Sequence, residues 1–174
     1  MAAAADLTPG ARISNRYRVE RLLGRGGMAA VYEVLEETSG TRYALKRLES
    51  KEPASQAQSL FQREYSALAQ LAHPRIVRVY DYALDGAVPY YLMELLSGAS
   101  VRSLAPLPWR EACSVLRDVA SALAIVHSRR LIHRDVTPRN IHRTADGHAK
   151  LMDFGSLCTI GVAPDIIGTP PFLA

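Results

Sequence analysis

Polar residues that could handle phosphate, a metal ion and a proton lie at a few separate places along the 174-residue chain. Asp135 and Asn140 stand five residues apart, and Asp153 follows thirteen residues after Asn140. Carboxylate and amide oxygens are hard ligands of the kind that Mg²⁺ prefers, and a carboxylate can also accept a proton. These residue types could hold a metal ion or accept a proton, but an aspartate followed by phenylalanine and glycine can also mark a simple turn after a strand.

A glycine cluster at residues 24–27 and a lysine at position 46 could bind an anion. Glycines let backbone amides approach phosphate oxygens closely, but between two strands such a cluster is more often a plain hairpin turn. Lys46 lies in an apolar segment, where a buried charge needs a partner, and a lysine in that position usually extends to solvent. Glu64 offers the opposite charge from the inward side of a predicted helix, with a surface glutamate as the alternative.

Apolar patterns predict the elements that must position these residues. Runs of apolar, β-branched and aromatic residues predict strands at 17–23, 30–35, 42–48, 76–82 and 90–95. Apolar residues at helical spacing predict helices at 55–72 and 109–127, the first of which ends at His73 and Pro74. The predicted apolar face of the second helix consists of Ala112, Val115, Leu116, Val119, Leu123 and Val126.

Four motifs occur in an order that resembles a protein kinase. They are a glycine loop with its following valine at 24–31, Tyr-Ala-Leu-Lys at 43–46, a His-Arg-Asp loop ending in asparagine at 133–140, and Asp-Phe-Gly at 153–155. The resemblance spans residues 16–174, and the phrases at 22–28 and 73–77 are typical of bacterial kinases of the eukaryotic Ser/Thr type.

The resemblance implies an α+β fold of two lobes. Residues 1–11 are then a flexible tail and residues 12–96 a complete N-lobe, with a five-stranded antiparallel sheet and helix C. Residues 97–174 form a partial helical C-lobe that carries the catalytic loop, the metal-binding loop and the activation segment. Because the chain stops where the Ala-Pro-Glu motif of kinases would be completed, we expect a fragment of a longer chain or one that another polypeptide completes.

The resemblance also implies roles for the polar residues. Asp135 would accept the proton of the substrate hydroxyl, and Asn140 and Asp153 would hold Mg²⁺. Lys46 would contact the α and β phosphates of ATP and pair with Glu64. The residues implied to bind ATP are Leu23, Gly24, Gly26, Val31, Ala44, Lys46, Met93, Glu94, Leu96 and Asp153. Ordinary core and loop packing would explain Met93, Glu94 and Leu96 equally well.

Two neighbours of the catalytic aspartate receive supporting roles from the resemblance. His133 is expected to brace the loop as a packed residue rather than to transfer a proton. Arg134 is expected to hold a phosphorylated activation segment, with Thr159 as the nearest acceptor and Ser156 as the alternative.

Three residues depart from the kinase pattern. Thr137 stands where most Ser/Thr kinases have a lysine, so one charge that neutralises the transferring phosphate is missing. His142 takes a place that an apolar residue normally fills under the adenine, and Ala29 replaces a third glycine. The function that the resemblance implies is a Ser/Thr protein kinase that transfers the ATP γ-phosphate to protein hydroxyls. The three departures favour the alternative, which is a pseudokinase or a nucleotide-binding interaction module. The segment 168–170 disfavours a tyrosine or small-molecule kinase.

Composition limits the partners. Lys and Arg exceed Asp and Glu by 21 to 17 without forming a basic block, which suits a nucleotide and does not indicate nucleic acid. Cys113 and Cys158 provide no disulfide framework, so a reducing, cytoplasmic compartment is expected. No window approaches the roughly 18 apolar residues that a membrane-spanning helix needs. The expected partners are ATP and a protein substrate.

Overall fold

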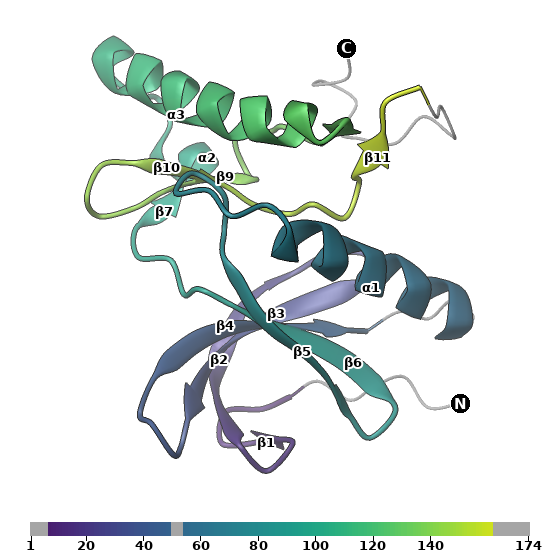
Figure 1. Cartoon of the computed structure of the whole chain (residues 1–174). Coiled ribbons are helices and arrows are strands. Elements are labelled where there is room, and N and C mark those ends of the chain that lie inside the picture. Colours follow the sequence, from purple (N-terminus) through teal and green to yellow (C-terminus); the bar gives the residue numbers. More distant parts are fainter. Residues whose placement is uncertain (1–6, 50–53, 162–174) are drawn as a thin grey trace. The chain divides into compact units, whose positions relative to one another are not determined.

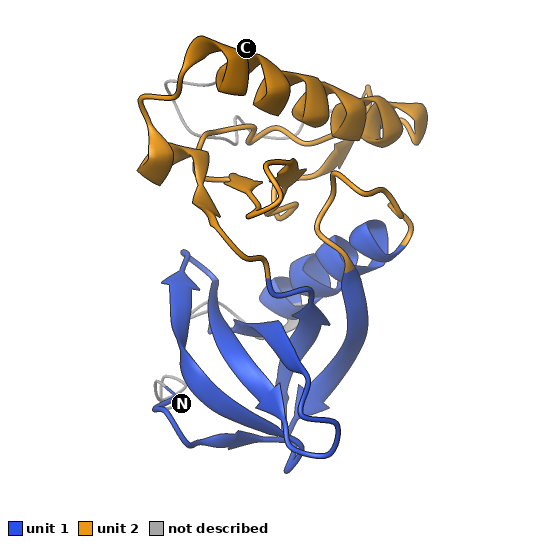
Figure 2. Cartoon of the chain, turned by 90° about the vertical axis from the view of Figure 1, so that its left-hand side faces the viewer, with its two compact units in different colours: residues 1–69, 79–95 blue, residues 70–78, 96–174 orange. Residues whose placement is uncertain are grey.

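The chain forms two compact units, which Figure 2 colours separately. Unit 1 comprises Met1–Ala69 and Val79–Leu95, and unit 2 comprises Gln70–Arg78 and Leu96–Ala174. This computed structural model describes residues 7–49 and 54–161. Most of the predicted N-lobe belongs to unit 1, but residues 70–78 and Leu96 group with unit 2.

An antiparallel sheet makes up most of unit 1 (Figure 1). In the described part of the chain it has six strands in the order β1-β2-β3-β4-β6-β5. The strands are β1 Arg12–Ile13, β2 Tyr17–Arg25, β3 Ala29–Glu36, β4 Arg42–Leu48, β5 Val79–Asp85 and β6 Val88–Met93. The predicted α+β class is confirmed, and the short β1 is added to the five strands that the sequence pattern indicates.

Alternate residues of these strands form the core of unit 1, as the two-residue period of a strand requires. The buried members of this cluster are Ile13, Tyr17, Val19, Ala30, Tyr32, Val34, Leu45, Tyr90 and Leu92. Strand β5 begins three residues later than predicted, because Ile76 makes an isolated bridge to Leu151 and Val77 donates its backbone N–H to the Leu151 carbonyl at 3.0 Å. The apolar residues at 76 and 77 therefore belong to unit 2.

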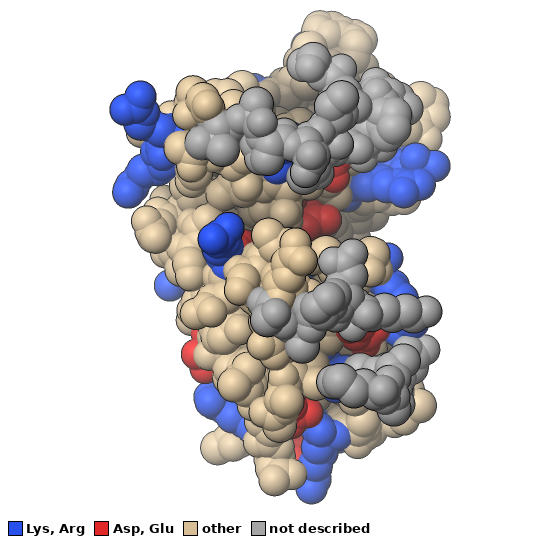
Figure 3. All heavy atoms as spheres, turned by 90° about the vertical axis from the view of Figure 1, so that its right-hand side faces the viewer, with Lys and Arg blue, Asp and Glu red and all other residues tan. Residues whose placement is uncertain are grey.

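Several arginines of the sheet pair with glutamates on neighbouring strands. Glu33 on β3 is 5% exposed and accepts hydrogen bonds from Arg42 at 2.6 Å and from Arg21 at 2.8 Å. Burial raises the pKa of Glu33, but the two guanidinium groups outweigh it and lower the pKa below its ordinary value. On the face drawn in Figure 3, basic side chains are interspersed with acidic and uncharged ones. Much of the positive charge is therefore neutralised locally.

Helix α1, Ala54–Ala69, packs on the sheet of unit 1 through an aromatic cluster. Phe61 and Leu68 are each 3% exposed, and the Phe61 ring lies 5.1 Å from the Tyr91 ring of β6. The helix ends at Ala69 rather than at the predicted residue 72, five residues before Pro74. A proline disfavours helical conformation in the residue before it, so the helix has to end in this region.

Unit 2 is built on the long helix α3, Trp109–Ser128, which matches the predicted helix closely. Leu116 of the predicted apolar face is 65% exposed. The buried stripe contains Val115, Asp118, Val119, Ala122 and Val126. A residue next to Val115 lies 100° further around the helix, so Leu116 points away from that stripe.

Short elements complete unit 2. Strands β7 Ala99–Ser100, β9 Ile141–Arg143 and β10 Ala149–Leu151 form one small sheet, and β8 Leu131–Ile132 pairs with β11 Cys158–Thr159. Helix α2 spans Val101–Leu104. No helix in residues 7–49 and 54–161 is long and apolar enough to cross a membrane.

Candidate active site

The loop 133–140 lies between β8 and β9 and is tied together by Asn140. The Asn140 side-chain amide donates to Asp135 Oδ2 at 2.7 Å and to the Asp135 carbonyl at 3.0 Å. The backbone N–H of Asn140 donates to the Thr137 carbonyl at 3.0 Å. The structure therefore brings two predicted site residues into direct contact. Their roles toward a hydroxyl and a metal stay predictions.

His133 is packed under this loop, as its predicted structural role requires. It is 1% exposed, and its ring lies 4.6 Å from the Phe154 ring in an edge-on arrangement. Its Nε2 donates to the Met152 carbonyl at 3.1 Å, which leaves Nδ1 to accept the Asp135 backbone N–H at 3.3 Å. Burial lowers the pKa of His133, and the Met152 carbonyl and nearby aspartates only partly offset it. The neutral ring thus connects the loop 133–140 to the segment that carries Asp153.

Asp153 and Arg134 have backbone conformations that few side chains adopt. Their φ angles are 57° and 64°, in the left-handed region. Such strained residues persist where the surrounding structure fixes them, and they often lie at functional sites. Arg134 Nε donates to the Ser156 carbonyl at 2.7 Å. Arg134 therefore already contacts the segment that it was predicted to hold, through a backbone carbonyl.

Strand β10 comes just before Asp153 in the chain, and its backbone is hydrogen-bonded to β9, to Arg75 and to Asp118 of α3. It pairs with β9, while the Leu151 N–H donates to the Arg75 carbonyl at 2.8 Å. From α3, Asp118 Oδ2 accepts the backbone N–H of Ala149 at 2.9 Å. These bonds fix the backbone just before the predicted metal ligand.

Asp118 is a buried carboxylate that the sequence interpretation missed. It is 3% exposed and lies 3.5 Å from Arg75 Nε and 3.3 Å from His148 Nδ1. Burial raises its pKa, but the Ala149 N–H and the cationic neighbours outweigh it and lower the pKa of Asp118. The sequence feature that could have identified Asp118 is the position of an acidic residue between Val115 and Val119, on the apolar face of the predicted helix.

His142 and Gly98 attach the segment after β6 to strand β9. His142 Nε2 lies 3.0 Å from the Ser97 carbonyl, and burial lowers the pKa of the imidazole. Gly98 has a φ of +93°, and a Cβ built on it would lie 2.1 Å from the Arg143 carbonyl oxygen. Only glycine fits here without moving the backbone.

Replacing Gly98 with alanine should lower the free energy of unfolding by about 2–4 kcal/mol, because the new methyl group would overlap a carbonyl at positive φ. Urea denaturation followed by circular dichroism measures this loss. Gly147→Ala is the matched control, since Gly147 also has positive φ (84°) but its nearest neighbour is a side-chain atom 3.9 Å away. The control should lose about 1–2 kcal/mol. If both variants lost the same unfolding free energy, the predicted overlap of the new methyl group with the Arg143 carbonyl would be contradicted.

In unit 1, Lys46 and Glu64 form a buried ion pair. Lys46 Nζ lies 2.7 Å from Glu64 Oε1, and the two side chains are 14% and 6% exposed. Lys46 is on β4, opposite Val31 of β3 and Tyr91 of β6. Glu64 is therefore not a surface residue, and Lys46 does not extend to bulk solvent.

Of the glycine cluster, Gly24 lies in strand β2 opposite Val31, and Gly26 and Gly27 lie in the turn between β2 and β3. The Gly26 N–H donates to the Ala29 carbonyl at 2.8 Å, and no atom lies within 4 Å of a Cβ built on Gly24 or Gly27. The turn is open, as either a hairpin or a phosphate-binding loop would be. Its phosphate contact stays a prediction.

The predicted ATP-binding residues are divided between the units. Those of unit 1 are Leu23, Gly24, Gly26, Val31, Ala44, Lys46, Met93 and Glu94, and those of unit 2 are Leu96 and Asp153. The described residues contain no cluster of three His, Cys, Asp or Glu side chains that could hold a metal. The predicted metal ligands Asn140 and Asp153 are oxygen donors, and Mg²⁺ commonly takes one or two such protein ligands together with phosphate and water. Their contact with a metal stays a prediction.

Unit 1 thus carries the Lys46–Glu64 pair between its sheet and α1, and unit 2 carries Asp135 and Asn140 on one loop. A family model described as protein kinase domain matches residues 17–174. The chain therefore belongs to the protein kinase family. Residues 50–53 and 162–174 of that match, which include the segment 168–170, lie outside the described residues.

Two relatives are serine/threonine-protein kinases of Mycobacterium tuberculosis. PknA is 35% identical over 181 residues, which cover 95% of this chain and 42% of PknA. PknL is 35% identical over 179 residues, which cover 97% of this chain and 45% of PknL. The chain thus spans less than half the length of these relatives.

Proposed function

We propose that this chain is the catalytic part of a bacterial Ser/Thr protein kinase, which transfers the γ-phosphate of ATP to a serine or threonine hydroxyl of a protein. The observation that carries the proposal is the buried Lys46–Glu64 pair at 2.7 Å. Burying two charges often costs more free energy than their attraction returns, so such a pair favours a functional role over a stabilising one. A lysine held in this way can meet the phosphates of a nucleotide.

The loop of unit 2 supports the proton and metal chemistry. Asp135 would accept the proton of the substrate hydroxyl, and Asn140 and Asp153 would hold Mg²⁺, which supplies neutralisation of the phosphate charge. The Asn140 amide nitrogen donates to Asp135. Its amide oxygen is therefore the atom that can ligate a cation, and the same residue aligns the base.

A second candidate, a pseudokinase that binds nucleotide or protein without transfer, is favoured by Thr137. This residue is 2% exposed and carries no charge where kinases place a lysine. Arg139, which is exposed at the end of the same loop, is the cation that could replace that lysine.

A cytoplasmic location is part of the main proposal, because ATP is the substrate and Cys113 and Cys158 are free thiols.

Phosphate transfer from γ-labelled ATP to a generic basic protein tests the proposal. Incorporation should require Mg²⁺ and should fall by about 10²-fold in Lys46→Met, because a preorganised positive charge is removed while the aliphatic stem is kept. Arg63→Met is the control, since Arg63 is an exposed neighbour of Glu64 on α1. Wild-type chain that binds ATP without transferring phosphate would support the pseudokinase instead.

A further inference from the structure

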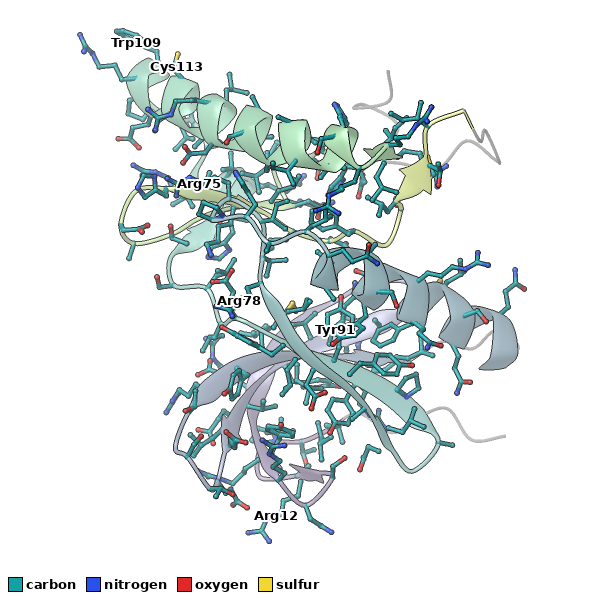
Figure 4. All side chains as sticks on the ribbon, in the orientation of Figure 1. Arg12, Arg75, Arg78, Tyr91, Trp109 and Cys113 are labelled. Atoms are coloured by element: carbon teal, nitrogen blue, oxygen red, sulfur yellow. The ribbon has the colours of Figure 1, made fainter. Side chains whose placement is uncertain are left out.

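Tyr91 of β6 is a third member of the Lys46–Glu64 pair. Its hydroxyl donates a hydrogen bond to Glu64 Oε1 at 3.0 Å, and the residue is 1% exposed. Figure 4 shows Tyr91 where the sheet of unit 1 meets α1. Nothing in the kinase motifs used above assigns this tyrosine a role.

Tyr91 touches both charges of the pair. Glu64 Oε1, which accepts the tyrosine hydroxyl, is also the atom 2.7 Å from Lys46 Nζ. Lys46 Nζ lies 5.9 Å from the centroid of the Tyr91 ring, at the outer limit of a cation–π contact. Tyr91 is the cross-strand partner of Lys46 in the β4–β6 ladder, which fixes this arrangement through the backbone.

The tyrosine ring also holds the helix that carries Glu64. It lies 5.1 Å from the Phe61 ring and 5.8 Å from the Tyr65 ring. Residues 61, 64 and 65 lie on one face of a helix, so Tyr91 contacts a single patch of α1 through its ring and its hydroxyl together. Rotation of α1 would break both kinds of contact.

Within the described residues, Lys46 and Tyr91 supply the hydrogen bonds to the Glu64 carboxylate. A hydrogen bond to a buried charged group is stronger than one between neutral groups, and its loss leaves the charge poorly satisfied. Without the hydroxyl, Glu64 would be held by Lys46 alone, and the direction of the lysine would be less strictly fixed.

We propose that Tyr91 is a positioning residue for phosphate transfer, whose hydroxyl fixes Glu64 and, through it, the Lys46 ammonium group. This inference rests on the proposed kinase function. A phenylalanine at position 91 would keep the ring contacts with Phe61 and Tyr65 and remove the hydroxyl that donates to Glu64. The Tyr91→Phe variant therefore tests the positioning role of the hydroxyl while the packing of the ring is kept.

The test compares Tyr91→Phe with wild type in steady-state phosphate transfer. We expect kcat/KM for ATP to fall about 10-fold, as loss of one hydrogen bond to a buried charge predicts, while KM for the protein substrate stays unchanged. Tyr82→Phe is the matched control, because Tyr82 belongs to the same aromatic cluster, with its ring 5.3 Å from Tyr65, and its hydroxyl makes no hydrogen bond to Glu64. The control should keep wild-type kinetics.

A double-mutant cycle with Glu64→Gln distinguishes positioning through Glu64 from a general structural effect. In the Glu64→Gln background, Tyr91→Phe should cause less than a 2-fold further loss. The same 10-fold loss in both backgrounds, or full activity in Tyr91→Phe, would overturn the inference.

Equilibrium binding of Mg²⁺-ATP separates this inference from the proposed function. Wild-type chain that binds ATP without transferring phosphate would reject the kinase activity alone. Tyr91→Phe should then bind ATP about 10-fold more weakly, and equal Kd values would reject the positioning role. Absence of both transfer and ATP binding in the wild type would reject both ideas.

Discussion

The Asp135→Asn variant should transfer phosphate about 10²- to 10⁴-fold more slowly than wild type, the range by which a positioned general base accelerates a reaction. Asparagine has the same shape, and its amide oxygen can still accept the Asn140 side-chain N–H that now lies 2.7 Å from Asp135 Oδ2. The loop should therefore keep its conformation while losing the ability to take up a proton. Single-turnover transfer from γ-labelled ATP measures the effect.

Asp146→Asn is the matched control for this prediction. Asp146 is an exposed carboxylate in the turn between β9 and β10, and it accepts the His148 N–H at 3.3 Å, which asparagine can also do. The control should retain wild-type transfer and unchanged denaturation. If Asp135→Asn also retained wild-type transfer, Asp135 would not be the base.

Asp118→Ala should lower the free energy of unfolding at pH 7 by about 2–4 kcal/mol. The substitution removes the acceptor for the buried Ala149 N–H and the counter-charge of Arg75, whose side chain is only 22% exposed. Urea denaturation at fixed temperature measures the change. Asp118→Asn, which can still accept the Ala149 N–H, should lose less than the alanine variant, and equal losses would assign the effect to charge alone.

The difference in unfolding free energy between wild type and Asp118→Ala should also depend on pH. The pKa of Asp118 is lowered from its ordinary value of 3.8 in the folded chain, so the carboxylate contributes stability that is fully present above about pH 4. That contribution is lost as the pH falls through the lower folded pKa. The gap between wild type and Asp118→Ala should therefore narrow below pH 4. A gap that stays constant down to pH 2 would contradict the lowered pKa.

Long periodic elements were predictable from the sequence, and short ones were not. Helix α3 and strands β3 and β4 follow from repeated apolar positions that their neighbours also satisfy. Strands of two residues, such as β1 and β11, contain too few positions to show any period. The shift of β5 has a different cause, since the backbone at Ile76 and Val77 bonds to Leu151 of strand β10 and not to the sheet of unit 1.

The residues of the candidate site were predictable where a motif named them. Lys46 and Glu64 meet as an ion pair, and Asp135 and Asn140 meet through a hydrogen bond. Tyr91 and Asp118 were not found because each contact is created by tertiary structure. A tyrosine in an apolar strand has the pattern of an ordinary core residue, and its hydrogen bond to a helix depends on a partner 27 residues away.

Because residues 70–78 belong to unit 2 while the segments on either side belong to unit 1, the chain passes from one unit to the other three times. No single cut can separate the units as continuous pieces. A chain ended after Leu95 would carry Ile76 and Val77, 1% and 3% exposed here, without strand β10, to which their backbone bonds. Exchange of the units between relatives would likewise need at least three matched junctions. Separating the two units in an engineered protein therefore requires breaking the chain at three places.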